Sequence, residues 1–210
     1  MDNKVVITIA RQYGSGGRTI AQMLSERLNI PFYDKDLIKK VSEESGINEA
    51  IFANADENSK GIGFINKLIK KNKPAPNTTP NDKDYTSPEN LFALQADIIK
   101  ELADSESCII VGRCADYILK DYDNVLSVFI HAPWEFCLEK AAEKKSLPSK
   151  ELEAFVRSTN KQREAYYKYF TDNEWSDARN YDLCLDSSKL GYERCVDEII
   201  AYMNIRFPKQ

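Results

Sequence analysis

Short runs of continuously apolar residues recur along the chain, and they constrain its fold more than any other feature. Strands that are buried on both faces of a sheet are apolar throughout, whereas strands with one solvated face alternate between apolar and polar residues. The runs therefore predict a parallel sheet whose two faces are both covered. They lie at residues 5–9, 30–33, 108–111, 125–130 and 181–185.

Between these runs lie segments with the spacing of amphipathic helices, in which apolar residues recur every three or four positions. Strands that alternate with helices build βαβ units and a sheet with helices on both faces. We therefore expect a three-layer α/β/α fold with a five-stranded parallel sheet, in a single domain over residues 1–210. The helical segments are residues 19–28, 91–102, 134–145, 150–170 and 192–205.

A polar stretch at residues 53–88 interrupts this alternation. It contains four prolines and many asparagine, aspartate and lysine residues. A segment of this composition is usually an excursion from the core. The pattern leaves open whether it forms an interface, a substrate-side insertion or a loose loop.

The composition excludes several kinds of chemistry. The chain has one histidine, His131, so a histidine-rich metal site is excluded and any histidine-dependent hydrolase would have to use that residue. The five cysteines include no C-x-x-C pair, which indicates reduced thiols. The net charge of −4 disfavours a nucleic-acid binder with a broad basic face. We see no membrane-spanning run and no secretion signal, and therefore expect a cytoplasmic protein.

A glycine-rich loop follows the first apolar run and precedes the first helix. It reads Gly14-Ser15-Gly16-Gly17-Arg18-Thr19. Glycines let successive backbone N–H groups converge on an anion, and the dipole of the following helix strengthens the attraction. The phosphate-loop pattern G-x-x-x-x-G-K-[ST] is not met, because Gln12 takes the place of the first glycine and the lysine is missing. Arg18 would supply the cation and Thr19 a hydroxyl for Mg²⁺, with a ligand-free turn as the alternative.

Charged residues follow three of the apolar runs, at the sheet edge where parallel folds bind ligands. Arg11 is a candidate phosphate ligand, with a surface ion pair as the alternative. Asp34 is a candidate ligand of an acceptor nucleotide or of hydrated Mg²⁺, or the N-cap of the next helix. Arg113 follows Gly112, which permits close approach, and is a candidate phosphate ligand. For Asp116, one helical turn later, a solvent-facing position is a sufficient explanation.

The helical segment 150–170 combines an apolar stripe with concentrated positive charge. Arg163 falls in the stripe, where a charge is costly unless it meets an anion. Phosphoryl transfer uses cations that close over the transferring group. We interpret Arg157 and Arg163 as cations of a lid, whereas a solvated helix face is the simpler interpretation of Lys161 and Lys168.

Five sequence blocks, in this order, resemble the cytidylate kinase-like family, a branch of the P-loop nucleoside monophosphate kinases. The blocks read ITIARQYGSGGR, PFYD, VGRCAD, YYKYF and YDLCL. The resemblance covers nearly the whole chain outside residues 53–88. It implies a P-loop fold with a helical acceptor-side insertion at residues 35–88 and a helical lid at residues 147–175. It also implies transfer of the γ-phosphoryl group of ATP to CMP or dCMP, with Mg²⁺.

The resemblance further implies roles by position. Residues 14–19 would hold the donor phosphates, and we expect Arg11 to join them because of its position at the strand end. Asp34, Arg113 and Asn160 would serve the acceptor nucleotide, and Arg157 and Arg163 would be lid cations. The implied partners are small-molecule nucleotides, with neither nucleic acid nor membrane, and the oligomeric state stays open.

Three positions depart from the pattern of authentic cytidylate kinases. Gly17 or Arg18 replaces the loop lysine, Asn160-x-x-Arg163 replaces the Asp-x-x-Arg of the lid, and residues 39–40 are two lysines in place of a Tyr-Arg pair. The sequence thus supports a nucleotide-binding phosphotransferase better than strict cytosine specificity. The alternatives are a non-catalytic nucleotide- or phosphometabolite-binding protein and a kinase of another small acceptor.

Overall fold

A parallel sheet of five strands lies at the centre of the molecule, in a computed structural model that describes residues 4–34 and 88–208. The strand order is β2-β3-β1-β4-β5. The central strand β1 pairs with β3 on one side and with β4 on the other. The parallel sheet expected from the apolar runs is confirmed. The strands are β1 Val6–Arg11, β2 Phe32–Tyr33, β3 Cys108–Val111, β4 Val125–His131 and β5 Leu183–Asp186.

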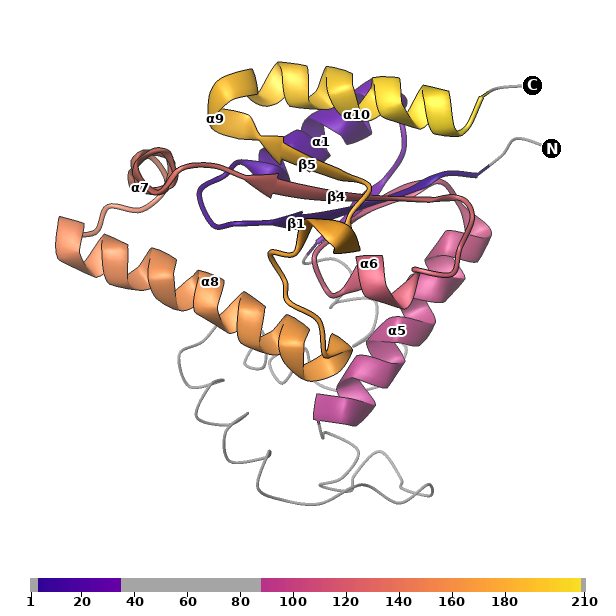
Figure 1. Ribbon diagram of the computed structural model, residues 1–210, viewed down its shortest axis with the longest axis horizontal. Coiled ribbons are helices and arrows are strands. Elements are labelled where there is room, and N and C mark those ends of the chain that lie inside the picture. The colour runs from indigo at the N-terminus through magenta and orange to yellow at the C-terminus, as the bar shows by residue number, and fades with distance from the viewer. Residues whose placement is uncertain (1–3, 35–87, 209–210) are drawn as a thin grey trace.

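Helices cover both faces of this sheet (Figure 1). One face packs against α1 and α10, and the other packs against α5, α6 and the C-terminal half of α8. The three-layer α/β/α arrangement is therefore confirmed. The helices are α1 Gly17–Leu28, α5 Pro88–Ser105, α6 Ala115–Ile118, α7 Trp134–Ala142, α8 Ser149–Thr171, α9 Ser187–Leu190 and α10 Tyr192–Arg206, with a 3₁₀ turn at Ala178–Asn180.

Side chains of β1 alternate between the two layers, as the pleat of a strand requires. Ile7 and Ile9 belong to the core beneath α1 and α10, whereas Val6 and Ala10 face the opposite layer. Thr8 lies on that second face. Its hydroxyl is buried and has no hydrogen-bond partner among the described residues.

The long helix α8 crosses the molecule from the end of α7 to α5 (Figure 1). Its N-terminal half packs on α7 through Leu152 and Val156, and its C-terminal half meets α5 where the rings of Phe92 and Phe170 stack with centroids 4.2 Å apart. Residues 150–170 were expected to be helical, and this prediction is confirmed. The expected acceptor-side insertion at residues 35–88 lies almost wholly outside the described residues.

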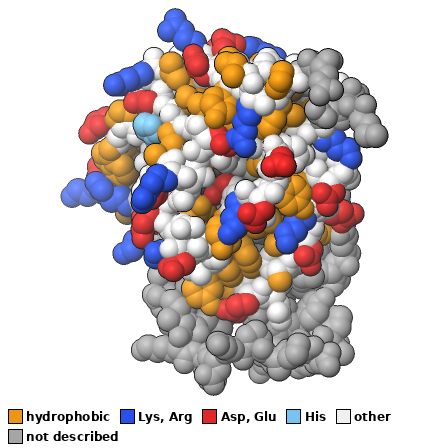
Figure 2. Space-filling model, turned by 45° about the vertical axis from the view of Figure 1, so that its right-hand side comes forward, with side chains coloured by type: hydrophobic (Ala, Val, Ile, Leu, Met, Phe, Trp, Pro, Cys, Tyr) orange, Lys and Arg blue, Asp and Glu red, His pale blue; other side chains and the backbone are white. Residues whose placement is uncertain are grey.

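On the face shown in Figure 2, acidic and basic side chains are interspersed with apolar ones. No helix within residues 4–34 and 88–208 is both long and apolar enough to cross a membrane.

Candidate active site

The glycine loop joins the C-terminal end of β1 to the first turn of α1. Gly14 and Gly16 have φ angles of 85° and 81°, a region that side-chain-bearing residues rarely adopt. Gly16 is the N-cap of α1, and its carbonyl accepts the first helical hydrogen bond, from the amide of Ile20 at 2.9 Å. The amides between these two residues are the ones that every helix N-terminus leaves without an intrahelical partner. They are available to an anion at this point.

Close packing also requires glycine in this loop. A Cβ atom on Gly14 would lie 2.2 Å from the carbonyl oxygen of Cys137, and one on Gly16 would lie 2.3 Å from the ring of Tyr192. Ser15 is fully buried, and its hydroxyl lies 3.0 Å from the carbonyl oxygen of Ile130. The side chain of Ser15 therefore points into the protein, and its carbonyl accepts a hydrogen bond from Ser187, so Ser15 anchors the loop to the core.

Helix α8 is hydrogen-bonded to the main chain at the start of the loop. The amide of Tyr13 donates to Oδ1 of Asn160 at 2.8 Å, and Nη1 of Arg163 donates to the carbonyl of Arg11 at 2.9 Å. The guanidinium of Arg163 also lies 5.8 Å from the ring centroid of Tyr13. The predicted lid segment is thus closed against the loop through two of the residues singled out in the sequence.

Three of the sequence-predicted site residues form one charged cluster. Asp34, whose side chain is 12% exposed, lies between Arg18 and Arg11. Its Oδ2 is 2.9 Å from Nε of Arg18, and its Oδ1 is 3.6 Å from Nη2 of Arg11. The ion-pair alternative for Arg11 is therefore realised. Within the described residues, this cluster holds two guanidinium groups and one carboxylate.

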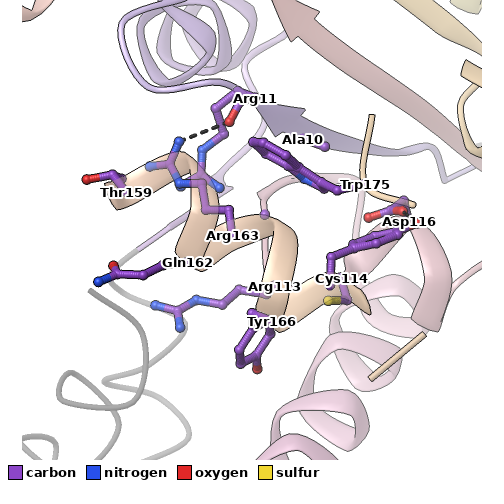
Figure 3. Close-up of a pocket in the computed structure, with 12 residues that line it drawn as sticks. Ala10, Arg11, Arg113, Cys114, Asp116, Thr159, Gln162, Arg163, Tyr166 and Trp175 are labelled. Atoms are coloured by element: carbon purple, nitrogen blue, oxygen red, sulfur yellow. Dashed lines mark hydrogen bonds between the residues drawn. The ribbon is translucent and has the colours of Figure 1, made fainter. Parts of the chain in front are cut away.

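A small cavity of about 50 Å³ opens where β1 and β3 end (Figure 3). Arg11, Arg113 and Arg163 all line it. The three arginines come from β1, from the turn after β3 and from α8, so the fold brings together cations that are far apart in sequence. An arginine-rich cavity suits an anionic ligand, because guanidinium groups bind phosphate and carboxylate through paired hydrogen bonds.

An unusual turn presents Arg113 to this cavity. Gly112, Arg113 and Cys114 have φ angles of 77°, 64° and 55°. A Cβ atom on Gly112 would lie 2.1 Å from Nη1 of Arg11, so the missing side chain makes room for that guanidinium. Residues other than glycine in this region cost about 1–3 kcal/mol each, and such strain clusters at functional sites.

The structure corrects the interpretation that Asp116 faces solvent. The residue does not face solvent; it is 8% exposed and lines the same cavity. The hydroxyl of Tyr167 donates to its Oδ2 at 2.6 Å. Burial raises the pKa of Asp116 to about 6, and the hydrogen bond from Tyr167 opposes that rise. The signal was absent from the local sequence, because the burial depends on a partner on α8.

Arg157 lies apart from the other cations of the prediction. It is exposed, and its guanidinium stacks on the ring of Trp134, 4.1 Å from the centroid. The structure does not bring it to the cavity that Arg163 lines.

The loop and its neighbourhood fit Mg²⁺ held jointly with a nucleotide. Within the described residues, no cluster of three or more histidine, cysteine or acidic side chains could hold a metal by itself. Mg²⁺ typically takes only one or two protein oxygens and completes its shell with water and substrate phosphates. The hydroxyl of Thr19, in the first turn of α1, and the carboxylate of Asp34 are oxygens of that kind.

Solved structures share this fold. An uncharacterized protein from Eubacterium ventriosum is 26% identical to the chain, with a TM-score of 0.71 and coverage of 96% of this chain and 99% of that one. A shikimate kinase from Acinetobacter baumannii is 13% identical, with a TM-score of 0.54 and coverage of 99% and 97%. A gluconokinase from Sinorhizobium meliloti is 16% identical, with a TM-score of 0.50 and full coverage of both chains. At this identity the two kinases show a common fold alone. No curated protein matches the sequence.

The family assignment follows from the sequence as a whole. The model of the cytidylate kinase-like family matches residues 6–189, which include the glycine loop, the Gly112 turn and helix α8. The five-stranded parallel sheet with helices on both faces is the fold of the kinases above. The chain therefore belongs to the cytidylate kinase-like family.

Proposed function

We propose that the protein transfers the γ-phosphoryl group of ATP to a nucleoside monophosphate, with CMP or dCMP as the acceptor. Membership of the family supports phosphoryl transfer in general. The observation that carries the proposal is the position of the arginine-lined cavity beside the glycine loop. A phosphate donor on the loop and a phosphorylated acceptor in the cavity would meet at one sheet edge.

On the donor side, backbone amides of residues 14–19 would hold the phosphates of ATP. Arg18 would take the part of the missing lysine. Thr19 would be a ligand of Mg²⁺, which when bound neutralises charge between the phosphates. Arginine is bulkier than lysine and bidentate, so this replacement changes the geometry of the contact. Release of Arg18 from Asp34 is the adjustment that the proposal requires.

On the acceptor side, Arg113 would bind the acceptor phosphate. Arg11, which the sequence assigned to the donor phosphates, lines the same cavity as Arg113 and would join it, oriented by Asp34. Arg163 would act between the two substrates, because it lines the cavity and is also bonded to the loop main chain. Asn160 would keep α8 closed on the loop through Tyr13. No strong base is needed, since positioning and charge neutralisation supply most of the rate in phosphoryl transfer.

The guanidinium of Arg157 stacks on Trp134. Arg157 would contribute to the site only after its side chain left this ring. A non-catalytic nucleotide-binding protein is the second candidate. The engagement of Arg18 with Asp34 favours it, because the only cation in the loop is already paired.

Coupled ATP turnover with CMP, dCMP, UMP and AMP, together with calorimetric binding of each nucleotide, tests the proposal. We expect turnover that is fastest with CMP or dCMP. Arg18→Ala should lower it about a hundredfold, as loss of one transition-state donor does. Arg194→Ala, the same change at an exposed position of α10, is the control and should have no effect. Binding without turnover would instead establish the second candidate, and unchanged turnover in Arg18→Ala would remove Arg18 from the mechanism.

A further inference from the structure

Asp116 is a buried carboxylate that none of the roles above uses. It lies in the first turn of α6, directly after the strained turn that carries Arg113. In Figure 3 it lies beyond Trp175, at the opposite end of the cavity from the guanidinium groups of Arg11 and Arg163. The cavity is therefore polarised, with cations at one end and an acid at the other.

Asp116 also separates this cavity from a larger one. A neighbouring cavity of about 350 Å³ is lined by Asp116 and Tyr167 as well, so these two side chains form a common wall. A polar side chain in such a wall can contact a ligand after a small movement of the side chains that form the wall. A polar side chain enclosed by core residues cannot.

Asp116 is a buried acid whose hydrogen bonds come from neutral groups. In the described part of the chain no lysine or arginine forms an ion pair with Asp116, so its charge is buried without a counter-ion. An asparagine has nearly the same shape but offers one acceptor oxygen in place of two. The carboxylate accepts hydrogen bonds from Tyr167 and from the backbone of Asp116 and Tyr117, yet burial outweighs them and raises its pKa. Buried acids with a strongly raised pKa occur preferentially at functional sites.

We propose that Asp116 selects the acceptor: its carboxylate accepts a hydrogen bond from an amino or hydroxyl group of the molecule whose anionic group the arginines bind. This inference rests on the proposed function for the presence of an acceptor in the cavity. An ionised carboxylate can only accept hydrogen bonds. A ligand that places a carbonyl oxygen there sets two acceptors against each other, and one that places a hydrogen atom there adds no hydrogen bond, so both bind more weakly than a ligand with a donor.

Nucleoside monophosphates offer a direct comparison of donor groups. CMP carries an exocyclic amino group where UMP carries a carbonyl oxygen, and CMP carries a 2′-hydroxyl that dCMP lacks. The three ligands share the phosphate that the arginines would bind. Differences in affinity among them therefore report the base and the sugar, and not the anionic end of the site.

Binding of CMP, UMP and dCMP should be measured by calorimetry, without ATP, for the wild-type protein, Asp116→Asn and Asp121→Asn. Asp121 is an exposed acid five residues along the chain, so the control makes the same chemical change outside the cavity. We expect the wild type to prefer CMP by about tenfold to a hundredfold over UMP or over dCMP. The preference should disappear in Asp116→Asn and persist in Asp121→Asn.

The pH dependence of the wild type provides a test that needs no variant. Protonation below about pH 6 turns the carboxylate into a donor, so the preference for CMP should fall as the pH is lowered through that value. The ratio of two affinities is used because the phosphate groups of both ligands also titrate near pH 6 and cancel. The titratable and charged groups that share the two cavities with Asp116 are Arg11, Arg113, Cys114, Arg163, Tyr166 and Tyr167 in the smaller, and Tyr117, Lys120, Tyr122, Tyr167, Arg179, Tyr181, Asp182 and Arg206 in the larger.

The outcomes separate this inference from the proposed function. Selective binding that Asp116→Asn abolishes supports the inference even if the wild type shows no turnover, in which case only the proposed phosphoryl transfer fails. An unchanged preference in Asp116→Asn, or an equal loss in Asp121→Asn, overturns the inference even if CMP is phosphorylated. Failure of the wild type to bind any of the three ligands overturns it as well.

Discussion

Ionisation of Asp116 should destabilise the folded protein at neutral pH, and Asp116→Asn should remove that penalty. Burial raises the pKa of this carboxyl group from 3.8 to about 6. At 1.36 kcal/mol for each pKa unit, the difference corresponds to about 3 kcal/mol of unfolding free energy. The conversion is meaningful here because the side chain is almost completely shielded from solvent.

The sign follows from which state holds the proton more tightly. The folded-state pKa is the higher of the two, so the folded protein binds more protons between about pH 4 and pH 6. The penalty is therefore complete above about pH 7, falls to roughly half at about pH 5 and is nearly absent at about pH 4. An asparagine at this position does not titrate. Any effect of its packing on the free energy of unfolding is therefore the same at every pH.

Urea unfolding of the wild type, Asp116→Asn and Asp121→Asn from pH 4 to pH 8 measures this effect. The stability of Asp116→Asn relative to the wild type should rise by about 2.5 kcal/mol across that interval. Asp121→Asn should show no such rise, because Asp121 is exposed. A pH-independent difference between Asp116→Asn and the wild type would refute the argument, since it would mean that the group has the same pKa in both states.

Three further substitutions test other parts of the structure. Gly112→Ala should cost about 1–2 kcal/mol in urea unfolding and weaken acceptor binding, because its Cβ displaces the guanidinium of Arg11; unchanged acceptor affinity would contradict this packing. Thr8→Val should raise stability by about 1 kcal/mol by removing a buried hydroxyl without a described partner, and a loss in thermal unfolding would show that the hydroxyl is satisfied. Asn160→Ala should remove about 1 kcal/mol of protection from the amide of Tyr13, seen as roughly fivefold faster hydrogen exchange; unchanged exchange would mean that α8 does not hold this amide.

The layout of the fold could be predicted from local sequence because it depends on local patterns. The run at residues 125–130 became β4 Val125–His131, and the segment 192–205 became α10 Tyr192–Arg206. Strands covered on both faces and helices with one apolar stripe leave distinct periodicities in the sequence. Boundaries were less accurate at residues 30–33, where the strand is limited to Phe32–Tyr33.

The arrangement of the site depends on contacts between distant segments, and the sequence shows these poorly. The sequence placed Arg11, Asp34 and Arg113 at strand ends, but the ion pairs among Arg11, Asp34 and Arg18 depend on the side-chain conformations at that edge. Asp116 was missed because its burial depends on Tyr167, which lies 51 positions away. Periodicity indicates which face of an element is apolar, but not which polar residue a distant helix will cover.

The attachment of α8 to the loop has a consequence for how this site tolerates sequence change. Two hydrogen bonds join α8 to main-chain atoms of the loop, the amide of Tyr13 and the carbonyl of Arg11. Every residue except proline supplies both of these atoms, so this part of the attachment depends on the path of the loop, whereas the ring of Tyr13 adds a side-chain contact with Phe155 and Arg163. The identity of the loop cation can therefore vary without detaching α8. A substitution of Arg18 would therefore leave these contacts of α8 in place.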